Sequence, residues 1–339
     1  MESHISVLLH ETINGLDIKK GGTYVDLTLG RGGHSSLLLT KLEDGLLIGV
    51  DQDIEAIKAS EERLLKFNKP FKLVHDNFVN VKTILNELGI EKVDGIMMDL
   101  GVSSPQFDDA SRGFSYREDA PLDMRMNQES SLNAKTIVNT YSFNELCRVF
   151  REYGDEKFAP KIANNIIAYR ANKPIETTFE LVEIIKKSKP MKELAKPGHP
   201  AKQVFQALRI EVNDELNVLK KALVDCLELL KPNGRLAVIT FHSGEDRIVK
   251  TIFKKYSTIE GSRHGIPLIN EEPDYEVINT KVIIPTEEEI QANRRSQSAK
   301  LRIIKRKWGK PQWKKNYTKQ ITNADIIESV NFWWFLSLC

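Results

Sequence analysis

The stretch DLTLGRGGHS, residues 26–35, decides how the first part of this chain is interpreted. It continues an apolar run that starts at Tyr24, and it leads through a glycine cluster into HSSLLLTKL, which favours a helix. A strand, a glycine loop and a helix in this order leave free backbone N–H groups at a helix N-terminus, which favours an anionic ligand. The question is whether the ligand is a phosphate.

The loop departs from the dinucleotide fingerprint G-x-G-x-x-G in two ways. Gly30 and Gly32 fit its first two positions, but Ser35 stands where the third glycine belongs. Asp26, four residues before Gly30, adds a carboxylate that repels a pyrophosphate and suits a ligand with an ammonium group. S-adenosylmethionine carries an amino and a carboxylate group and no phosphate, so the loop favours this cofactor over NAD.

Strands and helices alternate along the first hundred residues. Apolar runs predict strands at 46–51, 71–76 and 93–101, with helices between them, which is typical of a parallel sheet. Asp51 ends the strand at 46–51, which is the second when the strand before the glycine loop is counted, and an acid at this place accepts hydrogen bonds from ribose hydroxyls in NAD and S-adenosylmethionine sites alike. Asp99 closes the fourth, and we expect it to reach the adenine or a reacting amine at this edge of the sheet.

The pattern changes after residue 101 and returns near residue 201. An irregular polar stretch is followed by helices, one of which starts with a capping box of Ser142 and Glu145. Farther along the chain, one helix is predicted over 211–230. Further strands follow it, the last at 301–306. We therefore expect an α/β protein with a doubly wound Rossmann-like sheet and an inserted helical domain. The predicted domains are 1–104 with 201–307 for cofactor binding, 105–200 for substrate recognition, and a tail of unknown role, basic and then apolar, at 308–339.

Composition limits the function classes. The 339 residues are 41% apolar and 28% charged, as in an ordinary globular protein. The sequence contains no run of about 18 apolar residues that would predict a membrane span, and its start has no basic n-region that would predict a signal peptide. A cytoplasmic location is therefore expected. The three cysteines form no C-x-x-C and the histidines show no ligand spacing, which argues against a metal site.

The loop after the fourth strand carries the candidate catalytic residues. Ser103 and Ser104 lie in SSPQ, which is similar to the S-P-P-x and D/N-P-P-x loops of methyltransferases that act on exocyclic amines. Acceptors against the N–H bonds of such an amine help it to pyramidalise as it attacks a methyl group. The alternative is that the two serines belong to an ordinary Ser-Pro turn.

Several other polar residues keep two interpretations. His242 follows the fifth strand and either faces the site or is a hydrogen-bonded loop residue. Arg112, Arg117 and Arg125 either bind phosphates or pair with nearby acids. The segment between Ile290 and Asp325 has no acid and mixes eleven basic residues with aromatic ones, which suits RNA but also a solvated tail.

With these segments in order, the chain resembles the bacterial ribosomal RNA small-subunit methyltransferase H family, also called MraW. The matching stretches lie between residues 4 and 307 and are HISVLLHETINGL, DLTLGRGGHS, VDGIMMDLGVSSPQFDDASRGFSYREDAPLDMRM, YGDEKFAPKIA, HPAKQVFQALRIEVNDEL, NGRLAVITFHSGEDRIVK and NRRSQSAKLR. The resemblance implies a class I methyltransferase sheet and S-adenosylmethionine-dependent methylation of cytosine N4 at position 1402 of 16S rRNA. It implies the small ribosomal subunit as substrate.

The resemblance also implies a set of cofactor contacts. They fall on Gly32, Gly33, His34, Asp51, Phe78, Asp99 and Gln106. The sequence departs from the family's usual residues at Gly244, Gln297, Lys202 and Gln203, which bears on RNA affinity.

Three other functions stay open on the sequence alone. They are a NAD-linked oxidoreductase, a ribosome-binding factor without catalysis, and a methyltransferase for an exocyclic amine of DNA or another nucleic acid. The sequence leaves the oligomeric state open.

Overall fold

The computed structural model describes residues 6–101, 109–259 and 272–308. The chain divides into two units, Met1–Lys307 and Trp308–Cys339, and all elements below belong to the first. The predicted tail lies almost wholly outside the described residues. No helix in the described part is both long enough and apolar enough to cross a membrane.

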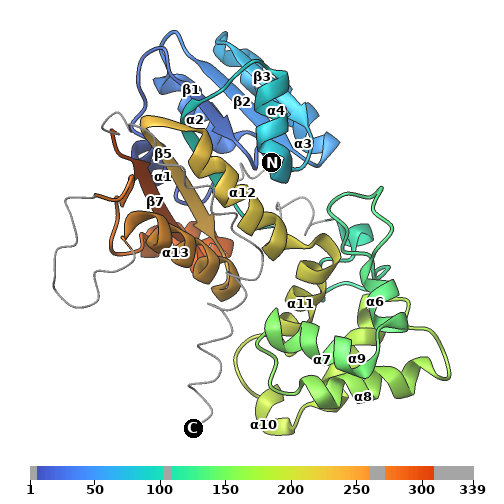
Figure 1. Ribbon diagram of the computed structural model, residues 1–339. Helices are drawn as coiled ribbons and strands as arrows, with labels where there is room; N and C mark the ends of the chain where they lie inside the picture. Colours follow the sequence, from blue (N-terminus) through green and yellow to red (C-terminus); the bar gives the residue numbers. More distant parts are fainter. Residues whose placement is uncertain (1–5, 102–108, 260–271, 309–339) are drawn as a thin grey trace. The chain divides into compact units, whose positions relative to one another are not determined.

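Seven strands form one sheet in the order β3-β2-β1-β4-β5-β7-β6 (Figure 1). The first five strands in this order pair in parallel. The order along the chain reverses between β1 and β4, and ligands bind at such a switch point. The strands are β1 (Thr23–Asp26), β2 (Leu46–Asp51), β3 (Phe71–His75), β4 (Val93–Asp99), β5 (Leu230–Thr240), β6 (Tyr275–Val277) and β7 (Lys300–Arg306).

Helices cover both faces of the sheet, which confirms the doubly wound α/β fold. Along β5, Leu236 and Val238 belong to one buried cluster, whereas Ala237 and Ile239 belong to another. This alternation puts successive side chains on opposite faces, and burial of both faces explains why the strands are almost wholly apolar. The first cluster includes residues of α4 (Val81–Glu87), α12 (Glu215–Leu229) and α13 (Ser243–Ser257), and the second includes residues of α1 (Leu9–Gly15), α2 (Gly33–Lys41) and α3 (Ile54–Leu64).

The last strand differs from the expected parallel arrangement. β7 runs antiparallel to both of its neighbours, β5 and β6. An antiparallel neighbour needs no crossover helix. The apolar pattern of 301–306 is the same for either direction, so the sequence alone did not reveal it. The short helix α14 (Glu287–Ala292) precedes this strand.

The chain between β4 and α12 forms a helical cluster with its own core. The capping box predicted at Ser142 and Glu145 begins α7 with both of its hydrogen bonds formed. A short helix, α10, lies within the proline-containing segment 189–202. The helices of this cluster are α6 (Ala134–Thr140), α7 (Phe143–Glu152), α8 (Ala159–Arg170), α9 (Thr178–Ser188), α10 (Met191–Leu194) and α11 (Lys202–Asn213).

The helix α11 packs with this helical core although it lies beyond residue 200. Val204, Phe205 and Leu208 are buried in the helical cluster. The single helix expected over 211–230 is instead two helices, because Asp214 takes a left-handed conformation with φ of 47° between α11 and α12. The domain limits remain a prediction, and the packing of α11 favours a second boundary at Asp214.

Candidate active site

Three aspartates end the three strands at the switch point. Asp26 ends β1, Asp51 ends β2 and Asp99 ends β4. Because the three strands are parallel neighbours, their last residues lie at the same edge of the sheet. The structure therefore brings the two predicted acids, Asp51 and Asp99, to the edge that the sequence indicated.

The glycines of the loop are required by its backbone and its packing. Gly32 precedes α2 with φ of 71°, and Gly30 has φ of 52°. A Cβ on Gly33 would collide with the Ser6 hydroxyl, and a Cβ on Gly32 would lie 3.3 Å from the Ser60 Oγ. The loop thus passes between these two side chains with room for hydrogen alone.

The Asp51 carboxylate fastens this loop to the end of β2. Its Oδ2 accepts a hydrogen bond from the Gly30 N–H at 2.8 Å, and its Oδ1 accepts one from the Asp53 N–H at 2.9 Å. Burial raises the pKa of Asp51 above its ordinary value. Each carboxylate oxygen has a second lone pair, which is the acceptor that a ribose hydroxyl requires.

Asp26 is turned into the protein. Its side chain is buried, its Oδ2 accepts from the Ser35 hydroxyl at 2.7 Å, and its Oδ1 accepts from the Thr28 N–H at 3.2 Å. Burial raises the pKa of Asp26 to about 6, against the lowering effect of the Ser35 hydrogen bond. Asp26 therefore holds the loop and the first turn of α2, and the direct contact with an ammonium group stays a prediction.

Asp99 has the least satisfied carboxylate at this edge. Its Oδ1 is buried and has no hydrogen-bond partner among the described residues, and its Oδ2 lies 3.7 Å from the His34 Nδ1. Although 27% of the side chain is exposed, burial and then the charges of Asp26 and Glu245 raise the pKa of Asp99 to about 8. A buried polar atom without a partner is costly. The arrangement fits a ligand that brings a cation or an N–H donor to Asp99.

His34 and Phe78 occupy fixed positions beside these acids. The His34 Nε2 lies 3.0 Å from the Val7 carbonyl oxygen, and the side chain is buried, so the ring is held between Val7 and Asp99. Phe78 begins a short turn after β3 and packs, half-buried, against the sheet core. The Asp76 N–H donates to the Asp51 carbonyl oxygen at 3.0 Å, which ties the segment before Phe78 to the end of β2.

The loop with the predicted catalytic residues is not part of this geometry. Ser103, Ser104 and Gln106 lie outside the described residues. Their roles stay predictions that rest on the sequence.

His242 takes part in a buried charged cluster that sequence reasoning missed. It caps α13 and lies 3.2 Å from Glu245, whose carboxylate accepts from the Phe241 N–H at 2.7 Å. Arg209 of α11 binds Glu215 of α12 through two hydrogen bonds of 2.8 and 2.9 Å. The sequence contained one sign of this cluster, because Arg209, Glu215 and Glu245 interrupt helix faces that are otherwise apolar.

The same cluster contains a set of groups of the kind that bind metals. One atom each of Glu215, His242 and Glu245 lies within 4.8 Å of the others. The guanidinium of Arg209 already neutralises Glu215, so the cluster is explained as an internal ion network that joins α11 to the end of β5.

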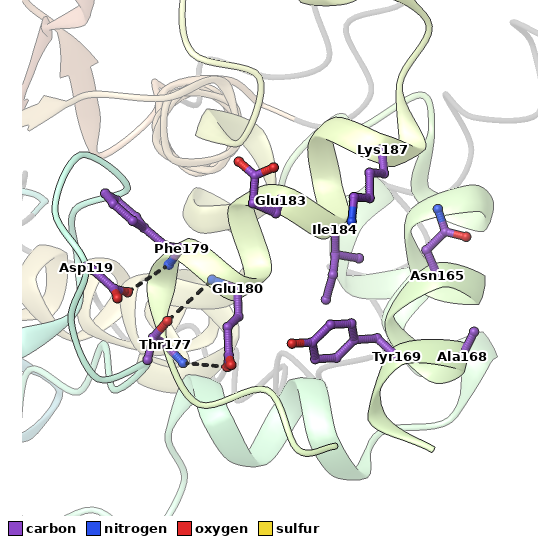
Figure 2. A pocket seen from close by; sticks show the side chains of 10 residues that line it. All are labelled: Asp119, Asn165, Ala168, Tyr169, Thr177, Phe179, Glu180, Glu183, Ile184 and Lys187. Carbon is purple, nitrogen blue, oxygen red and sulfur yellow. Dashed lines mark hydrogen bonds between the residues drawn. The ribbon is translucent and has the colours of Figure 1, made fainter. Parts of the chain in front are cut away.

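A pocket of about 810 Å³ is lined by residues of α8 and α9 (Figure 2), and none of the three aspartates lines it. Tyr169, Ile184 and Phe179 contribute rings and an apolar chain to its wall. Glu180 is occupied in the capping box of α9, and Asp119 accepts from the Phe179 N–H at 3.3 Å. None of the predicted site residues lines this pocket, so it is separate from the candidate active site.

The three arginines that the sequence left with two interpretations have different environments in the structure. Arg125 pairs with Asp123 through two hydrogen bonds of 2.9 and 2.7 Å. Arg112 donates to the carbonyl oxygens of Arg125 and Met126, both at 3.0 Å. Arg117 is exposed, and its guanidinium has no hydrogen bond or ion pair among the described residues. Two arginines thus stabilise the fold, and one stays accessible to a ligand.

A family model and several solved structures match this chain. A family model described as the MraW methylase family matches residues 1–307. Among solved structures, an rRNA methylase from Streptococcus thermophilus is 11% identical with a TM-score of 0.41, over 90% of this chain and 100% of that one. A putative rRNA-methylase from Clostridium thermocellum is 15% identical with a TM-score of 0.42, over 90% and 100%. A putative methyltransferase from Streptococcus mutans, in complex with SAH, is 13% identical with a TM-score of 0.42, over 89% and 99%.

Proposed function

The chain belongs to the MraW methylase family, so it is a methyltransferase whose methyl donor is S-adenosylmethionine, and we propose that it methylates ribosomal RNA. The target that we propose is the exocyclic N4 of a cytosine, position 1402, in the decoding region of 16S rRNA. We propose that the substrate is the assembled small ribosomal subunit in the cytoplasm, and that the base leaves its stack to enter the site.

The observation that supports this reaction most directly is the buried Oδ1 of Asp99 at the switch point, which has no hydrogen-bond partner in the described part of the chain. A methyltransferase for an exocyclic amine needs an acceptor against the N–H bonds of that amine. The family match also extends through the helical cluster, which supports a substrate larger than the cofactor.

In this proposal, different residues bind different parts of the cofactor. The cofactor, when bound, supplies the electrophilic methyl group. Asp51 accepts from the ribose hydroxyls, Phe78 lies against the adenine, and the loop of Gly32, Gly33 and His34 faces the methionine end. The contact of Asp51 follows from its place at a strand end, whereas those of Phe78 and of the glycine loop rest on the family resemblance.

Asp99 receives the N–H of the attacking amine. The lone pair of cytosine N4 is delocalised into the ring, so a hydrogen bond that keeps the N–H bonds oriented favours attack on the methyl group. In its ionised form, Asp99 can also accept the proton that the methylated amine loses, and burial, which raises its pKa to about 8, makes that form a stronger base than an ordinary aspartate. Ser103 and Ser104 are proposed as further acceptors, and Gln106 as a cofactor contact.

The test is methylation of small subunits from cells that lack this gene. We expect rRNA mapping to find one cytosine that has lost its N4-methyl group, and the purified protein with labelled S-adenosylmethionine to restore it. Label transfer to duplex DNA instead would favour the alternative, a methyltransferase for another nucleic-acid exocyclic amine. No transfer at all would favour a ribosome-binding factor, and tight binding of NAD alone would favour an oxidoreductase.

Replacement of Asp51 by alanine is expected to weaken S-adenosylmethionine binding by about 1–3 kcal/mol, the range for a lost hydrogen bond to a charged group. Isothermal titration measures the affinity. The matched control is Asp53→Ala, which removes the cap of α3 but leaves the strand-end carboxylate. If both variants bind the cofactor as the wild type does, Asp51 does not contact the ribose.

A further inference from the structure

A second polar site lies in the helical cluster, around the turn between α10 and α11. The ring of His199 stacks on Tyr116 with centroids 4.3 Å apart and an interplanar angle of 11°. Tyr116 in turn meets Phe205 of α11 edge to face at 5.7 Å. The stacked pair is therefore anchored on the helical core, and both of its rings are half-buried.

The His199 ring is held in one orientation. The Ala201 N–H donates to the His199 Nδ1 at 3.3 Å, so a neutral ring carries its proton on Nε2. The Lys189 ammonium donates to the Pro200 carbonyl oxygen at 2.7 Å and pairs with Glu156 at 2.6 Å, in a buried contact. This contact fixes the turn that carries His199.

Cations surround this turn. Partial burial and then the charges of Lys186, Arg117 and Lys189 lower the pKa of His199. Lys189 is neutralised by Glu156, and Lys186 makes only a solvent-exposed pair with Glu183. Arg117, next to Tyr116, is exposed and has no ion pair within the described part of the chain. Arg117 and Lys186 therefore bring accessible positive charge close to His199, which favours an anion.

Lys202 adds a further charge to the same turn. Its backbone N–H donates to the His199 carbonyl oxygen at 3.1 Å, and its side chain is exposed.

We propose that Arg117, Lys186, His199 and Lys202 form a binding site for the phosphodiester backbone of the RNA substrate. The flexible cations and the fixed Nε2–H of His199 are groups that bind phosphate oxygens. Such contacts position the RNA and do not distinguish one base from another. The identity of the RNA rests on the proposed function, whereas the existence of the site does not. Arg117 and its neighbours are positioning residues that orient the substrate while the chemistry occurs at Asp99.

The test compares Arg117→Gln with Arg63→Gln, an exposed arginine on α3 that also has no ion pair within the described residues. Binding is measured by fluorescence anisotropy with a fluorescein-labelled RNA hairpin of the decoding region over a range of salt concentrations. We expect Arg117→Gln to bind about 3- to 10-fold more weakly and to reduce the salt slope of log K by about 0.7, while Arg63→Gln changes neither. In methylation of small subunits, Arg117→Gln should raise KM and leave kcat unchanged.

A second variant separates the donor from the ring stack. His199→Phe keeps a flat ring on Tyr116 but has no Nε2–H, and we expect it to weaken RNA binding while S-adenosylmethionine affinity stays at the wild-type value. Equal affinities and salt slopes for Arg117→Gln, Arg63→Gln and the wild type would overturn the site. A wild type that binds the hairpin through Arg117 but transfers no methyl group would support the site and contradict the proposed function.

Discussion

Replacing Asp99 with asparagine is expected to lower the rate of methyl transfer by about 100-fold or more and to make the cofactor-free protein more stable at pH 8. The first effect follows because the amide is not a base and presents donors toward a donating amine. The second follows because the buried Oδ1 has no partner among the described residues, so its ionised form is poorly solvated. The same substitution thus measures both the contribution of Asp99 to the reaction rate and its effect on the stability of the folded protein.

The sign of the pH dependence comes from the direction of the shift. The pKa of Asp99 is about 8 in the folded protein and has an ordinary value of 3.8. Between these pH values the folded protein keeps a proton that the unfolded chain has lost, so a rise in pH favours unfolding. The free energy of unfolding should therefore decline from about pH 4 to about pH 8. Asp26, whose pKa is raised to about 6, adds to the decline below that value.

Denaturant unfolding of the cofactor-free protein at several pH values measures this effect. At pH 8, Asp99→Asn should be more stable than the wild type by about 1–3 kcal/mol, because the amide carries no charge that must lose its solvation at this buried position. The matched control is Asp94→Asn on the same strand, because Asp94 is paired with Lys231 and with the Thr23 N–H. This control should lose stability and keep its activity. A wild type whose stability rises between pH 5 and 8 would contradict the assignment for Asp99.

Strand positions and strand-end acids were accessible from the sequence because both depend on local patterns. The strands β1, β2, β3 and β4 are short apolar runs between turns, and the rule for parallel sheets then places Asp51 and Asp99 at one edge. The direction of β7 was not accessible, since pairing partners far apart in the chain determine it. The three residues of β6 were also too few to form a pattern.

The environment of each site residue was less predictable than its position. The sequence indicated an acid at Asp26 but not that Ser35 and Thr28 would donate hydrogen bonds to its oxygens. Asp26 therefore supports the loop, and its contact with a ligand stays a prediction. In the same way, three arginines in one irregular stretch looked equivalent. Only the packed structure distinguished Arg125, held by Asp123, from Arg117, which has no such partner among the described residues.

Replacing Lys189 with methionine is expected to destabilise the protein by about 3–5 kcal/mol, the cost of leaving one member of a buried ion pair without its partner. The side chains of Lys189 and Glu156 are 7% and 1% exposed, and the Glu156 Oε1 also accepts from the Phe158 N–H at 2.9 Å. Without the ammonium, the Glu156 carboxylate stays charged in the helical core. The Pro200 carbonyl oxygen loses its donor as well.

The double variant Lys189→Met with Glu156→Gln tests this cause. Glutamine keeps an acceptor for the Phe158 N–H and carries no charge, so the double variant should recover part of the lost stability, measured by circular dichroism during urea unfolding. The control is Lys186→Met, whose pair with Glu183 is 42% and 57% exposed and should contribute no more than about 0.5 kcal/mol. If Lys189→Met costs no more than this control, the pair does not stabilise the helical core. If the cost is large, the same contact that stabilises the core also fixes the His199 turn, and the rescued double variant should still bind RNA more weakly than the wild type because Pro200 remains without its donor.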